Sequence, residues 1–278
     1  MRQGGAVKKI GIALSGGGSK GLSHIAFLKA LDEMGLRPSI MAGTSTGAVI
    51  GGFYAAGISG AEIENIANNI DFLDLGRMLD VSIWRSIAFF RGDGIVKFLR
   101  KRIPARRFED LQTPMKIVAA DFWKRQEVIF DSGELIPAIR ASMSLPAIFE
   151  PVQIGGRVFV DGGLVNPLPY DIIRKDCNVL VAIDVSGAKT AQEEDVLPGM
   201  FESLVSSFQI LEAAIVEAKM RMAKPDIYVR PSLENIRVLE FNRFDEIMDG
   251  VQDDVGRFKL ELEHRLKKSF SFFKRFRS

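Results

Sequence analysis

One serine of this chain stands where a nucleophile is expected. Ser45 lies at the centre of the string Gly43-Thr44-Ser45-Thr46-Gly47. An apolar stretch typical of a strand precedes the string, and a helical pattern follows it. This G-x-S-x-G context predicts a nucleophile elbow, a sharp turn that exposes the serine hydroxyl at a helix N-terminus. The alternative is a glycine turn without chemistry.

A second glycine-rich string precedes the serine, and it reads Gly16-Gly17-Gly18-Ser19-Lys20-Gly21. Free N–H groups at such a strand-to-helix turn can bind an anion. The string also matches G-x-G-x-x-G, but a dinucleotide site needs an acidic residue about 20 residues further on, and the next strand ends without one. We therefore expect an oxyanion hole formed by the amides around Gly17 and Gly18. A turn without a ligand is the alternative.

No histidine has the expected place of a general base. The chain has 2 histidines. His264 lies in a charged C-terminal helical pattern that is typical of a solvated face, and His24 lies on the first predicted helix, where it is expected to pack against the glycine loop. A Ser-His-Asp triad in α/β-hydrolase order needs a late histidine on a loop, and neither residue fits.

A buried carboxylate can serve as the base instead. Asp161 closes the predicted strand at 157–160, and Gly162 and Gly163 let the chain turn sharply after it. In an open parallel sheet the carboxyl ends of the strands face one crevice, which would bring Asp161 to the side of Ser45. Asp161 is therefore the favoured base.

Two rivals remain for this role. Asp121 and Asp184 also end apolar strands, although paired glycines follow neither of them. A strand-end aspartate is also commonly a turn former or a helix cap, which is the alternative for Asp161 itself.

The elements that position these residues alternate between strand and helix patterns. Strand-like runs occur at residues 9–14, 39–42, 116–120, 127–130, 157–160, 179–185 and, more weakly, 227–229. Helical patterns occur at residues 22–31, 201–222 and 245–268. The alternation predicts an α/β fold with a mostly parallel central sheet flanked by helices, in a single domain over residues 1–278. The polar segment 187–198 is expected to be a surface loop and a candidate lid.

Composition and charge limit the partners and the compartment that we expect. The 37 Lys and Arg residues nearly balance 35 Asp and Glu residues, so the net charge of +2 gives no global attraction to nucleic acid. The single cysteine, Cys177, cannot form an internal disulfide, which favours a reducing cytosol. Residues 38–61 carry no charge, but glycines and hydroxyl residues argue against a membrane span there.

Four strings in order resemble the patatin-like phospholipase family over about residues 8–185. They are the glycine loop, the serine elbow, Ala141-Ser142-Met143-Ser144-Leu145-Pro146 and Asp161-Gly162-Gly163. The resemblance implies a three-layer patatin-like sandwich, lipid acyl esters as substrates, and no metal or cofactor. It also implies a histidine-free dyad of Ser45 and Asp161, with the loop Gly16–Gly21 as the oxyanion hole.

The third string resembles the pocket-lining turn of the family. It suggests Met143, Leu145 and Phe149 as contacts for an acyl chain, with ordinary core packing as the alternative. His24 falls where many bacterial members of the family carry a histidine, which fits a structural role.

Two basic clusters are candidate contacts for other molecules. The segment 260–278 ends in lysines and arginines interleaved with phenylalanines, so we expect either peripheral contact with the inner membrane surface or a frayed tail. The second cluster comprises Lys97, Arg100, Lys101, Arg102, Arg106 and Arg107. Nucleic-acid binding by either cluster lacks a supporting motif. The oligomeric state is left open.

The sequence thus predicts a cytoplasmic serine acyl hydrolase that cleaves fatty acyl esters of phospholipids or related lipids through an acyl-enzyme. A thioesterase or acyltransferase with the same dyad is the nearest alternative. A lipid-sensing scaffold with an idle dyad is a second alternative.

Overall fold

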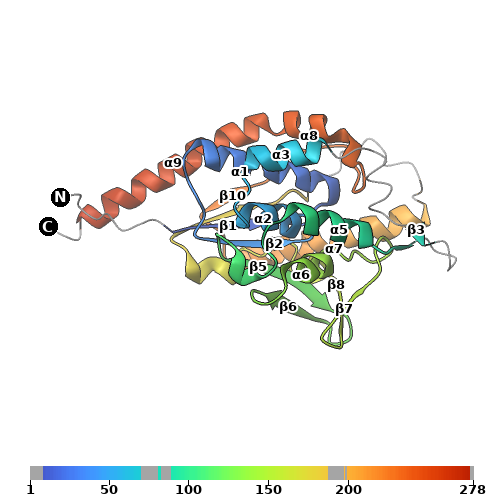
Figure 1. Cartoon of the computed structure of the whole chain (residues 1–278). Helices are drawn as coiled ribbons and strands as arrows, with labels where there is room; N and C mark the ends of the chain where they lie inside the picture. The colour runs from blue at the N-terminus through green and yellow to red at the C-terminus, as the bar shows by residue number, and fades with distance from the viewer. Residues whose placement is uncertain (1–8, 70–80, 83–88, 187–196, 198, 276–278) are drawn as a thin grey trace.

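The protein is organised around one central mixed sheet (Figure 1). The structure is a computed structural model that describes residues 9–69, 81–82, 89–186, 197 and 199–275. The strand order is β10-β9-β1-β2-β5-β8-β7, and β6 also pairs with β5. The strands are β1 (Ile10–Leu14), β2 (Ile40–Thr44), β5 (Met115–Asp121), β6 (Gln126–Phe130), β7 (Val152–Ile154), β8 (Arg157–Asp161), β9 (Val179–Ile183) and β10 (Ile227–Val229). A separate antiparallel pair joins β3 (Val81–Ser82) to β4 (Phe89–Phe90).

The sheet is parallel in one half and antiparallel in the other. Strands β10, β9, β1, β2 and β5 pair in parallel, whereas β6 and β8 run antiparallel to β5, and β7 runs antiparallel to β8. The predicted α/β architecture is confirmed. The strand before Asp161 was expected to be parallel, however, and that part of the prediction is wrong.

Helices cover both faces of the sheet. They are α1 (His24–Glu33), α2 (Thr46–Ala55), α3 (Gly60–Asn68), α5 (Asp93–Arg102), α6 (Leu135–Ser142), α7 (Met200–Met222), α8 (Phe244–Gly250) and α9 (Gln252–Arg275). In Figure 1, α1, α3, α8 and α9 lie above the sheet. On the other face, the core includes Val216 of α7 and Ile173 of η4 (Asp171–Asp176).

Burial explains why the parallel strands read as continuous apolar runs. Every residue of β1, β2 and β9 is buried. Along β1, Ile12 and Leu14 pack into the core with α1 and α2, while Ala13 packs into the core on the other face. A strand covered on both faces has no polar side, so the alternation expected of a half-exposed strand is absent.

The long helices match the sequence pattern with one interruption. Helix α7 lies within a residue of the predicted 201–222. The predicted helix at 245–268 is instead two helices that meet at the buried Val251. The candidate lid at 187–198 lies outside the described residues, apart from Leu197.

The turn from β2 into α2 lies very close to β1. A Cβ on Gly47 would overlap the carbonyl oxygen of Leu14 and lie 2.6 Å from that of Ser15. Backbone groups cannot move away as a flexible side chain can, so this position requires glycine.

We expect Gly47→Ala to lower the free energy of unfolding by about 1–3 kcal/mol through overpacking. Gly256→Ala is the matched control, because it adds the same methyl group in α9 where nothing lies within 4 Å. It should raise stability by about 0.5–1 kcal/mol through helix propensity. Urea unfolding measures both, and equal effects would contradict the close approach.

Candidate active site

Ser45 has a strained backbone at the sharp turn between β2 and α2. Its φ is 54° and its ψ is −121°, a region that L-residues rarely adopt. The Ser45 N–H donates a hydrogen bond to Ser142 Oγ at 2.9 Å. The side chain lines a cavity at the N-terminus of α2. This strained backbone at a strand-to-helix turn is the geometry that a nucleophile elbow requires.

Strand β5 brings Asp161 next to this turn. Its residue Val118 pairs with Thr44 of β2 and with β6, and the next residue, Ala119, pairs with Asp161 and with β6. Strands β2 and β8 both lie opposite β6, so they share one edge of β5. Along this edge of β5, Asp161 therefore lies directly after the end of β2, which is the point where Ser45 follows in the chain.

The Asp161 carboxyl is buried, with 2% of the residue exposed. Its Oδ1 accepts a hydrogen bond from the Gly163 N–H at 2.7 Å. Burial raises the pKa of Asp161 to about 7, and hydrogen bonding from Gly163 and from the Ser45 side chain opposes part of that rise. A carboxyl with this pKa can exchange a proton near neutral pH.

The glycine loop offers two amides to a ligand. The Gly16 N–H donates to the Pro167 carbonyl at 3.0 Å, and the Ser19 N–H donates to the Val238 carbonyl at 2.9 Å. Among the described residues, the amides of Gly17 and Gly18 have no acceptor. Both glycines line the cavity with Ser45, which narrows the predicted oxyanion hole to these two N–H groups.

The rest of the loop has close packing partners. A Cβ on Gly18, whose φ is 58°, would overlap the Val238 carbonyl, and a Cβ on Gly21 would overlap the Thr46 side chain. Thr46 Oγ1 donates a hydrogen bond to the Gly18 carbonyl at 2.9 Å. Lys20 of the same loop is buried.

His24 supports the glycine loop by a hydrogen bond to the residue that precedes it. Its Nε2 lies 2.9 Å from the Ser15 carbonyl oxygen, to which it donates, and burial lowers the pKa of the imidazole to about 4. Ser15 Oγ in turn accepts a hydrogen bond from the Val185 N–H at 2.9 Å. His264 is exposed on α9. Neither histidine lines the cavity that holds Ser45.

The two rival aspartates have structural partners. Asp121 forms an ion pair with Arg157 at 2.7 Å and accepts the N–H groups of Trp123 and Lys124. Asp184 accepts hydrogen bonds from the Tyr228 hydroxyl at 2.7 Å and from Ser186. Asp121 acts as a turn former, and neither carboxylate lines the cavity.

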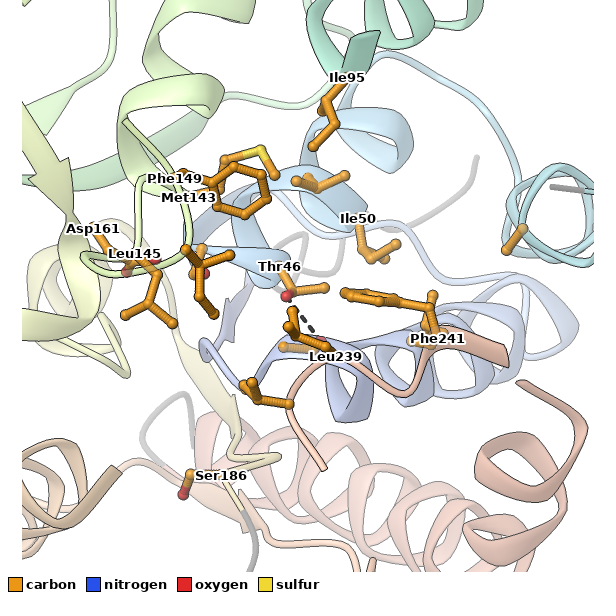
Figure 2. Close-up of a pocket in the computed structure, with 18 of the residues that line it drawn as sticks. Thr46, Ile50, Ile95, Met143, Leu145, Phe149, Asp161, Ser186, Leu239 and Phe241 are labelled. Atoms are coloured by element: carbon orange, nitrogen blue, oxygen red, sulfur yellow. Dashed lines mark hydrogen bonds between the residues drawn. The ribbon is translucent and has the colours of Figure 1, made fainter. Parts of the chain in front are cut away.

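An apolar cavity of about 220 Å³ opens beside Ser45 and Asp161 (Figure 2). Met143, Leu145 and Phe149, which the sequence suggested as pocket residues, all line it. Other walls come from residues that the sequence did not single out, including Ile50 of α2, Ile95 of α5 and Phe241. Their apolar side chains alone could not distinguish a cavity wall from the core.

The segment 141–146 also braces both predicted dyad residues, which the sequence did not reveal. Ser142 accepts the N–H of Ser45, and the Ser144 carbonyl accepts the Asp161 N–H at 3.0 Å. The buried Arg140 donates to Ser144 Oγ at 2.6 Å. Glu212 of α7 lines the cavity as well, and nothing in its helical sequence context marked it.

The described residues contain no group of three or more His, Cys, Asp or Glu side chains that could hold a metal ion. The helices of the described segments also include none with the length and apolar character needed to cross a bilayer. Helix α9 extends into the basic C-terminus, where side chains beyond residue 267 lie outside the description, so the membrane contact stays a prediction.

The family model of patatin-like phospholipases matches residues 12–173, more than half of the chain. The chain belongs to this family. The patatin-like match includes the serine elbow, the glycine loop and Asp161, and it confirms the family resemblance of the sequence.

Relatives of this patatin-like chain are longer proteins. An uncharacterised NTE family protein of Mycobacterium tuberculosis is 32% identical over 199 residues, which are 71% of this chain and 55% of that protein. Lysophospholipase NTE1 of Saccharomyces cerevisiae is 28% identical over 279 residues, 91% of this chain and 16% of that protein. The chain therefore spans about half the mycobacterial relative and a small part of the yeast one.

A solved structure shares the fold. VipD of Legionella pneumophila superimposes with a TM-score of 0.52, at 14% sequence identity, over 90% of this chain and 67% of that one. At this identity the likeness concerns the patatin-like fold.

Because the folded state opposes ionisation of Asp161, this residue should cost stability as the pH rises from about 4 to its folded pKa of about 7. Asp161→Asn removes the charge and should therefore stabilise the protein by about 2–4 kcal/mol at pH 8, with the gain vanishing near pH 4. Chemical unfolding at both pH values measures the difference.

Asp121→Asn is the control of opposite sign. Backbone N–H groups and Arg157 hold the pKa of Asp121 below its usual range, so its loss should destabilise the protein at pH 8. A stability gain for both variants, or for neither, would contradict the assigned environments.

Proposed function

We propose that the chain is a serine acyl hydrolase that cleaves fatty acyl esters of phospholipids or related lipids, with Ser45 as nucleophile and Asp161 as base. One observation carries the proposal. A strained serine and a buried carboxyl of raised pKa meet at an apolar cavity, beside two backbone amides that have no acceptor among the described residues. This combination has the parts that acyl transfer requires.

In the first half of the reaction, Asp161 accepts the proton of the Ser45 hydroxyl as Ser45 Oγ attacks the ester carbonyl carbon. The carbonyl π electrons move to the oxygen, and the N–H groups of Gly17 and Gly18 stabilise the resulting oxyanion. When the tetrahedral intermediate collapses, the bond to the alcohol breaks and Asp161 returns its proton to the leaving oxygen.

In the second half, water replaces the alcohol. Asp161 takes a proton from the water as the hydroxide oxygen attacks the acyl carbon of acyl-Ser45. The same two amides stabilise the second oxyanion. Collapse releases the fatty acid, and Ser45 Oγ recovers its proton from Asp161. The cycle consumes one water per ester and needs no histidine.

The substrate class rests on the cavity and on the relatives. The cavity is lined mainly by aliphatic and aromatic side chains, which favour an acyl chain over a polar group. The yeast relative carries the name lysophospholipase. A phospholipid, a lysophospholipid or another lipid ester shares this acyl chemistry, so the headgroup is left open.

A fluorophosphonate probe tests the nucleophile. We expect a covalent adduct on the wild type and none on Ser45→Ala, with Ser23→Ala as a control because Ser23 is buried in the loop helix. Asp161→Asn should lower ester turnover by about 10²–10⁴-fold, the usual contribution of a general base. His24→Gln and His264→Gln should keep a sizeable fraction of it.

Several outcomes separate the alternatives. If the folded wild type forms no adduct, the lipid-sensing scaffold is the interpretation that remains. An adduct with faster turnover of thioesters, or of esters with an added acyl acceptor, would support the thioesterase or the acyltransferase. Loss of turnover in folded His24→Gln would overturn Asp161 as the base.

The raised pKa of Asp161 also predicts the acid side of the pH profile. The base must be ionised, so kcat/KM should fall about tenfold per pH unit below the Asp161 pKa of about 7. Hydrolysis of a soluble p-nitrophenyl ester between pH 5 and 8 measures this limb. A limb centred near pH 4 would contradict a buried aspartate as the base.

A further inference from the structure

A second carboxyl lies beside the proposed base. Glu212 projects from α7, which packs against η3 (Gly162–Leu164), the turn that follows Asp161. A Cβ on Gly163 would overlap Glu212 Oε1 and would lie 3.2 Å from Asp161 Oδ1. The two carboxyls therefore lie against the same glycine. An alanine at position 163 could not coexist with this position of Glu212.

Glu212 also approaches the glycine loop. Its Oε1 lies 3.9 Å from the place that a Cβ on Gly16 would take, and the residue lines the cavity together with Gly17 and Gly18. Glu212 thus borders both the proposed base and the loop that would bind the oxyanion.

The charges around Glu212 oppose its ionisation. Asp161, at the end of β8, and Asp184, directly after β9, are the charged groups that act on it. Within the described residues Glu212 forms no ion pair and no hydrogen bond, and Lys219 of the same helix is bound to Asp171 and to the Leu168 carbonyl. Burial and the two aspartates raise the pKa of Glu212 to about 8.

We propose that Glu212 is a positioning residue of this site, held protonated beside Asp161 at neutral pH, and that its ionisation ends activity on the alkaline side. The kinetic part of this inference rests on the proposed hydrolase function. When Glu212 is protonated, the pair of Glu212 and Asp161 carries a single negative charge. That charge is on Asp161 when Asp161 acts as the base. Ionised Glu212 adds a second negative charge next to the loop where the oxyanion forms, which raises the barrier.

The first test does not depend on catalytic activity. In protein carrying glutamate labelled with ¹³C at the side-chain carboxyl, one resonance should titrate near pH 8 and should be missing in Glu212→Gln. In Asp161→Asn the same resonance should titrate at lower pH, because one opposing carboxylate is gone. Absence of any glutamate titrating above about pH 6.5 would overturn the proposal.

The second test is the pH profile of p-nitrophenyl ester hydrolysis. The wild type should lose about tenfold in kcat/KM at one pH unit above the Glu212 titration. Glu212→Gln, which mimics the protonated form, should keep its activity there and retain the acid limb. An alkaline limb that persists in this variant would overturn the proposal, and so would a wild type that lacks the limb.

A control on the same helix separates charge from helix effects. Glu217 is exposed and paired with Arg221 at 2.6 Å, so Glu217→Gln should leave both limbs unchanged. If the wild type hydrolyses no ester at any pH, the proposed function fails, while the ¹³C titration still decides the protonation of Glu212. If Glu212→Gln does not fold, the shift of the glutamate resonance titration in Asp161→Asn decides the protonation of Glu212.

Discussion

The site depends on one constraint, which is that β2 and β8 pair one after the other along the same edge of β5. β2 occupies this edge up to Val118, and β8 takes it from Ala119 onward in the opposite direction. The end of one strand therefore meets the end of the other. Ladder hydrogen bonds fix both ends to the same rigid strand, so Ser45 and Asp161 are held together by backbone pairing. Side-chain contacts need only orient them.

Much of this arrangement could be predicted from the sequence because its local signals are strong. The parallel strands are continuous apolar runs, and the glycines at 43 and 47 mark a turn that tolerates no side chain. The expected parallel strand that placed Asp161 on the side of Ser45 does not hold in the structure, since β8 is antiparallel to β5. The local feature was sound, because an aspartate before two glycines can close a strand and turn.

Other parts depend on contacts that no local pattern records. Ser142 and Ser144 brace the two proposed catalytic residues across long stretches of chain. Glu212 reaches the site because α7 crosses η3, and its own helix shows only mixed polar and apolar residues. The break at Val251 was also invisible, because the helical periodicity continues through it. Contacts between residues far apart in the sequence determine the positions of Ser142, Ser144 and Glu212.

The segment 141–146 alternates between two tasks. Ser142 and Ser144 hold the backbones of Ser45 and Asp161, while Met143 and Leu145, the residues between and after them, form the cavity wall. Substitutions of Met143 or Leu145 should therefore also disturb the positions of Ser45 and Asp161. Under the proposed function, divergence of acyl-chain preference should therefore accumulate on walls such as Ile95 of α5 and Phe241, which carry none of the reacting groups.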